Sequence, residues 1–68
     1  MEKFVTFREI TYEIWRHGHY TGRDVSVTKR LDKFEEADHR LRLDYPRDEG
    51  YYLKKIKDQN YTLEIEEA

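Results

Sequence analysis

The first quarter of the chain is dense in β-branched and aromatic residues, and its apolar and polar positions alternate. Ile10, Tyr12 and Ile14 share one side of an extended segment, and the other side holds Thr11, Glu13 and Trp15. A period of two is typical of a half-buried strand, so residues 4–16 are predicted to be a strand. A helix is the alternative, with an apolar stripe at Phe4, Phe7, Ile10 and Ile14.

A polar stretch with two glycines separates this segment from a second alternating one. The spacing allows either a tight turn at His17-Gly18 with a bulge at Gly22, or one wider loop. In both cases a β-hairpin is predicted, because Val25 and Val27 then join the apolar face of the first strand.

The middle of the chain carries the signals that bound a helix. Asp32 is a suitable N-cap residue, and Glu35 follows three positions later, where a capping-box residue reaches back. Pro46 disfavours helical geometry at the residue before it, so the helix is predicted to end near Asp44.

The apolar stripe of this helix runs through Phe34, Ala37 and Leu41. The outer face offers acid-before-base pairs at a spacing of four, which support a helix, namely Glu36–Arg40 and Asp38–Arg42.

Two further strands are predicted, over Tyr51–Ile56 and Tyr61–Glu66, with a turn at residues 57–60. Either the pair Tyr52 and Ile56 or the pair Tyr51 and Leu53 faces inward. The order is then ββαββ: an α+β domain over residues 1–68, with an antiparallel sheet of three to four strands and one helix on a single face. The predicted core consists of Ile10, Tyr12, Ile14, Val25, Val27, Phe34, Ala37, Leu41, either Leu53 or Ile56, Leu63 and Ile65.

Composition supports a folded domain despite its small size. The 68 residues are 41% charged and 37% hydrophobic, which leans toward disorder, but 15% are aromatic, and disordered segments are poor in aromatics. With no cysteine, the chain has neither disulfides nor a thiolate zinc site. No apolar run reaches signal-peptide or membrane-span length, so a cytoplasmic location is expected, in the host cytoplasm if the protein is viral.

Residues with catalytic or metal-binding chemistry are sparse, so we expect neither an enzyme nor a bound cofactor or metal. A metal site would require His17 and His19, together with Asp24, to converge, and Gly18 interrupts the strand that could align the two imidazoles. Ser26 lies in an alternating segment without a nucleophile motif.

Nucleic-acid binding is the alternative function. Tyr51 and Tyr52 precede Lys54 and Lys55, and aromatic side chains beside basic ones on a sheet can stack single-stranded bases. The formal net charge of −2 opposes this, because phosphate neutralisation supplies most of the affinity of such proteins.

Protein–protein binding is the function that these observations favour. Trp15 falls on the sheet face that a single helix leaves uncovered, unless Phe4 and Phe7 fold back over it. Acidic residues near the C-terminus suit a basic partner surface. The predicted partner-binding residues are Trp15, Tyr20, Tyr51, Glu64 and Glu66. The oligomeric state, monomer or homodimer, stays open.

Three short runs extend this interpretation. Residues 12–15, residues 34–37 and the pair Tyr51-Tyr52 resemble the compact ββαββ proteins common in phages and mobile elements. Some of those proteins inhibit host defence systems by occluding a surface. The resemblance therefore implies a small regulator or inhibitor of a larger assembly.

Overall fold

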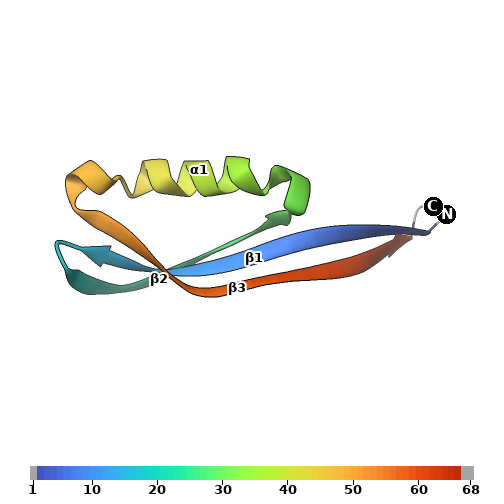
Figure 1. The fold of residues 1–68 in the computed structure, drawn as a ribbon, viewed down its shortest axis with the longest axis horizontal. Helices are drawn as coiled ribbons and strands as arrows, with labels where there is room; N and C mark the ends of the chain where they lie inside the picture. Colours follow the sequence, from blue (N-terminus) through green and yellow to red (C-terminus); the bar gives the residue numbers. More distant parts are fainter. Residues whose placement is uncertain (1, 67–68) are drawn as a thin grey trace.

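A computed structural model describes residues 2–66 of the chain as three strands and one helix. All strand pairing is antiparallel, in the order β2-β1-β3, and the helix covers one face of the sheet (Figure 1). The fold is thus α+β, with the order ββαβ. The elements are β1 (Glu2–Arg16), β2 (His19–Arg30), a 3-10 turn (Leu31–Lys33), α1 (Phe34–Asp44), a second 3-10 turn (Arg47–Glu49) and β3 (Tyr51–Glu66).

The predicted fourth strand is absent from these residues because the last two predicted strands are one strand, β3. The segment predicted as a turn, residues 57–60, pairs with β1, which is long enough to supply partners along its whole length. Its polar side chains serve as cross-strand partners: Lys57 lies 2.8 Å from Glu9, and Asp58 pairs with Arg8. The strand is interrupted only by a bulge at Ile56. Lys55 pairs with Tyr12 and Lys57 pairs with Thr11, so Ile56 has no partner on β1.

The first hairpin confirms the tight-turn alternative, and residues 4–16 are strand. His17 and Gly18 have φ angles of 50° and 79°, the left-handed geometry that a two-residue hairpin turn needs and that glycine adopts without strain. The register shifts between Ile14, which faces Arg23, and Trp15, which faces Tyr20. Thr21 and Gly22 therefore have no pairing partner on β1, and they form the predicted bulge.

The helix ends at Asp44 as predicted but begins later than predicted. Phe34 is its first residue, and no side chain caps its N-terminus. Asp32, the predicted cap, lies within the preceding 3-10 turn and forms an ion pair with Arg30 at 3.4 Å. The predicted pair of Asp38 with Arg42 is present at 3.0 Å.

The core lies between the helix and the middle of the sheet. Ile10, Tyr12, Ile14 and Phe34 are buried. Val25, Val27, Leu41 and Leu53 pack against this cluster, as predicted, and Ala37 is half-buried. Of the two alternatives Leu53 and Ile56, the core takes Leu53, and Ile56 is exposed. The predicted core positions Leu63 and Ile65 are wrong because these side chains are exposed. Ile56 occupies the bulge, and Leu63 and Ile65 lie on the sheet face opposite the helix.

Beyond the helix, the sheet narrows to two strands. β2 begins to pair with β1 only at Phe7, so residues 2–6 of β1 pair with residues 62–66 of β3 alone. We call this two-stranded segment the arm; it projects past the helix in Figure 1. It makes the molecule long, with extents of 50 × 18 × 14 Å. The radius of gyration is 14.9 Å, against about 11 Å for a compact chain of this length.

Candidate interaction surface

No element within residues 2–66 covers the sheet face opposite the helix, and we call this face the open face. Strand alternation sends Trp15 and Glu13 to this face and their neighbours Tyr12 and Ile14 to the core. Three zones follow one another along it: an aromatic cluster at the hairpin end, a belt of ion pairs and an apolar zone on the arm.

The aromatic cluster is built around Trp15. Its ring lies 5.9 Å from that of Tyr20, and Tyr52 is its cross-strand neighbour on β3. The indole Nε1 donates to Glu13 Oε1 at 3.2 Å, and the Lys54 ammonium lies 5.5 Å from the ring centroid. Trp15 is half-buried by these neighbours, whereas Tyr20 and Tyr52 are exposed. Phe4 and Phe7 lie further along the same strand and do not cover Trp15.

Tyr20 is held in place by a carboxylate. Its hydroxyl donates to Asp24 Oδ1 at 2.6 Å. This hydrogen bond, with a smaller contribution from burial, raises the pKa of Tyr20 to about 12. The Tyr20 hydroxyl is therefore protonated and donates a hydrogen bond to Asp24 on the same strand, which orients the ring.

The central belt consists of cross-strand pairs. Glu9 accepts from Lys57 at 2.8 Å and from Gln59 at 3.0 Å, and the bond from Lys57 is the main reason why the pKa of Glu9 is lowered. Lys54 lies 4.0 Å from Glu13. Because these charges already have partners, the belt offers little to a ligand.

The arm supplies the apolar zone. At its base Phe7 and Tyr61 stack with ring centroids 5.7 Å apart. Val5 faces Leu63 in the next pair outward, and Ile65 follows on the same face. Leu63 is 48% exposed and Ile65 40%. A two-stranded ribbon is marginally stable in water by itself, so apolar side chains left open on one are unusual.

The predicted partner-binding residues do not form a single patch. Trp15 and Tyr20 are together on the open face, and Tyr52 completes their cluster where Tyr51 was expected as a member. Tyr51 lies on the helix side, edge-on to Tyr45 at 5.3 Å and beneath the Arg16 guanidinium. The two acidic residues, Glu64 and Glu66, lie on the arm, far along β3 from the aromatic cluster.

The residues predicted for nucleic-acid binding are divided between the two faces, because consecutive strand residues point in opposite directions. Tyr52 and Lys54 are on the open face, and Tyr51 and Lys55 are on the helix side. The Lys55 ammonium forms an ion pair with Asp58 at 3.2 Å. These four side chains therefore do not make one stacking platform.

Sequence reasoning missed the apolar zone of the arm. Leu63 and Ile65 alternate as core positions do, but the bulge at Ile56 reverses the alternation along β3, so they lie on the open face whereas Leu53 lies on the helix side. Within residues 2–66, no three His, Asp or Glu side chains are grouped in a way that could hold a metal ion. Over the same residues, no helix is long and apolar enough to cross a membrane.

Comparisons with protein-family models, with curated proteins and with solved structures find no match for this chain.

Proposed function

We propose that this chain is a non-catalytic protein-binding module whose partner covers the apolar zone of the arm and the adjoining open face. The observation that carries the proposal is the exposure of Leu63 and Ile65 on a segment with only two strands. Surfaces of this kind on small proteins mark interaction sites.

The energetics of the arm support the proposal. Apolar side chains stabilise a fold by leaving water, by about 25 cal/mol per Å² of buried surface. Leu63 and Ile65 obtain only part of that gain in the free protein. A partner that packs on this exposed apolar surface removes it from water and so supplies the rest of that stabilisation. The stacked rings of Phe7 and Tyr61 lie at the base of the arm and extend the surface for such packing.

The aromatic cluster supplies a second contact region. Trp and Tyr are enriched among the residues that dominate binding energy, and a ring already oriented loses little entropy on binding. Trp15 and Tyr20 are oriented by Glu13 and Asp24 respectively. We therefore place Trp15 and Tyr20 in the interface with Tyr52.

The nucleic-acid alternative receives less support, because the lysines on β3 are paired with carboxylates. A module without catalytic groups acts on a larger assembly by covering part of its surface. That is the regulator or inhibitor class implied by the resemblance to phage and mobile-element proteins. Residues 2–66 form one strand fewer than those proteins have, so the proposal rests on the surface itself.

The test is affinity capture from the source organism or its host. Because the chain has no cysteine, Asp48→Cys in the second 3-10 turn gives a unique biotinylation point at the opposite end from the arm. The double variant Leu63→Thr with Ile65→Thr keeps strand-forming residues and should lose the captured partner. Leu43→Gln is the matched control, since Leu43 is 66% exposed on the helix, and it should retain the partner.

Trp15→Ala tests the aromatic cluster once the partner is known. A loss of about 2 kcal/mol of binding free energy is expected for an anchoring tryptophan. Retention of the partner by the double arm variant would refute the proposal. A gel shift of a single-stranded oligonucleotide in low salt would instead support the nucleic-acid alternative.

A further inference from the structure

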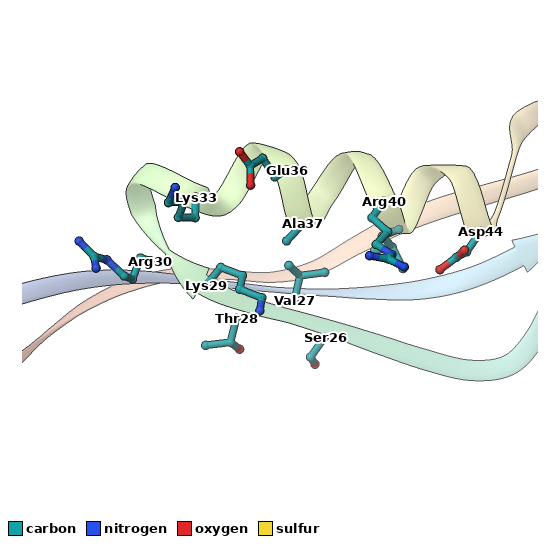
Figure 2. Close-up of a pocket in the computed structure, with 11 residues that line it drawn as sticks. Ser26, Val27, Thr28, Lys29, Arg30, Lys33, Glu36, Ala37, Arg40 and Asp44 are labelled. Carbon is teal, nitrogen blue, oxygen red and sulfur yellow. The ribbon is translucent and has the colours of Figure 1, made fainter.

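A groove runs between α1 and the outer edge of β2, on the side of the molecule away from the open face. Its volume is about 740 Å³, and its floor is apolar, made by Val27, Ala37 and Leu41. Figure 2 shows Val27 beneath Ala37, whereas Ser26 and Thr28 point away from the helix.

Basic side chains surround this floor. Lys29 and Arg30 come from β2, and Lys33 and Arg40 come from the helical segment, against two acids, Glu36 and Asp44 (Figure 2). Lys29, Lys33 and Arg40 form no ion pair with any residue between positions 2 and 66, and Arg30 pairs with Asp32 alone. In a chain with a net charge of −2, this is a local excess of unpaired positive charge.

The open face shows that such an excess is not a general property of the sheet. There Lys54 and Lys57 each have a carboxylate partner within 4.0 Å. Charges on an edge strand also protect it from aggregation, which accounts for Lys29. That explanation does not extend to Lys33 and Arg40, which belong to the segment across the groove.

Besides its apolar floor and its basic side chains, the groove has a third feature, the backbone of β2. β2 is an outer strand of the sheet, so no strand of the described part of the chain lies beside one of its edges, and residues 26–30 line the groove along that edge. An extended peptide can add to a free edge by main-chain hydrogen bonds, with alternate side chains entering pockets beside it.

We propose that this groove binds an extended acidic segment of a partner protein as a fourth strand beside β2. The free edge supplies the main-chain pairing. On the side of the added strand that faces the helix, apolar side chains contact the floor and acidic side chains contact the unpaired cations. A phosphate backbone would use the cations but neither the floor nor the edge. The inference goes beyond the open face, and neither proposal depends on the other.

Fluorescence anisotropy at low salt tests the groove directly. The probe is a fluorescein-labelled peptide with the repeat Val-Val-Glu-Glu, long enough to run beside residues 26–30, so that the side facing the helix presents both valine and glutamate. Three comparison probes separate the contributions: the same peptide with lysine for glutamate, the same peptide N-methylated at alternate residues to block strand pairing, and single-stranded oligothymidylate. Only the unmodified acidic peptide should bind.

The protein variants are matched in charge. Lys33→Gln with Arg40→Gln should weaken binding of the acidic peptide about tenfold, since two exposed ionic contacts are lost. Lys54→Gln with Lys57→Gln removes the same charge from the open face and should change the affinity by no more than about twofold. Both pairs of side chains are exposed, so unchanged melting temperatures will show that the variants are folded.

Four results would overturn the proposal: no binding of the acidic peptide in low salt, equal binding of the N-methylated peptide, equal binding of oligothymidylate, or equal losses in the two double variants. A fifth concerns a second copy, because residues 63–66 also carry both apolar and acidic side chains. A dimer in sedimentation velocity that Lys33→Gln with Arg40→Gln dissociates would assign the groove to self-association instead. A monomeric protein that binds the acidic peptide supports the assignment to a partner.

Discussion

The helix-backed part of the sheet and the arm are built on the same strand, β1, and show what alternation alone does not determine. In the helix-backed part, Ile10 and Ile14 are 3% and 1% exposed. On the arm, Leu63 and Ile65 keep a large part of their surface in water although they alternate in the same way. The difference is the cover: α1 packs on the face that holds Ile10, whereas Leu63 and Ile65 lie on the open face, beyond the end of β2. Alternation specifies two faces, and tertiary packing decides whether either is buried.

The comparison implies an uneven distribution of stability. A fully buried Ile or Phe side chain contributes about 1.5–3 kcal/mol. The helix-backed part has Ile10, Ile14 and Phe34 in this state, whereas the arm is held by strand pairing and by surface contacts such as the 3.1 Å hydrogen bond between the Thr6 and Thr62 hydroxyls. The arm should therefore open locally before the whole domain unfolds.

Removing the cover should have the largest effect. Phe34 joins the helix to Ile10 and Tyr12 and lies under the Arg8 guanidinium at 4.8 Å. Phe34→Ala should cost about 3–5 kcal/mol. A chain of this length has about 3–10 kcal/mol of stability in total, so this variant should be largely unfolded by circular dichroism.

Two controls accompany this variant. Leu43→Ala, at an exposed helix position, should leave the melting temperature nearly unchanged. Phe34→Leu keeps most of the volume and should unfold cooperatively at a lower temperature than the wild type. If Phe34→Ala melts near the wild-type temperature, the helix does not provide the core described here.

A smaller effect should follow from the polar contact that ties the helix to β1. The Tyr12 hydroxyl donates to Asp38 Oδ1 at 2.9 Å, in a half-buried setting. Tyr12→Phe removes this bond while Asp38 keeps its contact with Arg42, so we expect a loss of about 1 kcal/mol in urea unfolding. Tyr52→Phe, at an exposed ring, is the control and should have no measurable effect.

Local patterns predicted the helix-backed part of the fold well. The tight turn at His17-Gly18, the strand over residues 4–16 and the end of the helix before Pro46 all depend on the backbone preferences of nearby residues. The core residues Ile10, Tyr12, Ile14 and Phe34 follow from alternation and helical spacing once the helix is placed on the sheet.

Long-range pairing accounts for what local patterns missed. The residues at 57–60 have turn-forming composition, but β1 offers each of them a partner, and the pairing overrides the local preference. For the same reason the exposure of Leu63 and Ile65 could not be foreseen, because it depends on the bulge at Ile56 that arises where β3 pairs with β1. The groove cations were missed as a group because they come from two elements that only the fold brings together.

The boundary between the two regions should respond to acid. Asp58 accepts two hydrogen bonds from Arg8, at 3.2 and 3.0 Å, and these, with a further bond from Lys55, lower its pKa to about 2. The unfolded chain has an ordinary carboxyl pKa of about 3.9, so the stabilisation is fully present above about pH 4 and is lost as the pH falls toward 2. Melting temperatures measured across this range should fall less steeply for Asp58→Asn than for the wild type. Parallel curves would show that Asp58 does not tie Arg8 to β3.

Hydrogen exchange compares the two regions without a large change in stability. Amides of residues 10–14 should exchange only through global unfolding, and those of the arm through local opening. The double variant Leu63→Thr with Ile65→Thr should alter the free energy of global unfolding by no more than about 0.5 kcal/mol, as expected for exposed sites. Equal protection of the arm and the helix-backed part in the free protein would contradict the comparison.

The smallest expected effect concerns the hydroxyl that orients the aromatic cluster. The hydrogen bond to Asp24 raises the pKa of Tyr20 to about 12, against about 10 in an unfolded chain. Its contribution is therefore fully present below pH 10 and is lost as the pH rises toward 12. The pKa of Tyr12 is also raised, by burial and by Asp38, so tyrosinate absorbance should show late ionisation of both Tyr12 and Tyr20. Tyr20→Phe should remove one of these two late ionisations, and Asp24→Asn should lower the pKa of Tyr20 toward its ordinary value. If Asp24→Asn leaves the titration unchanged, Tyr20 is not held by Asp24, and the aromatic cluster is less ordered than the helix-backed core beside it.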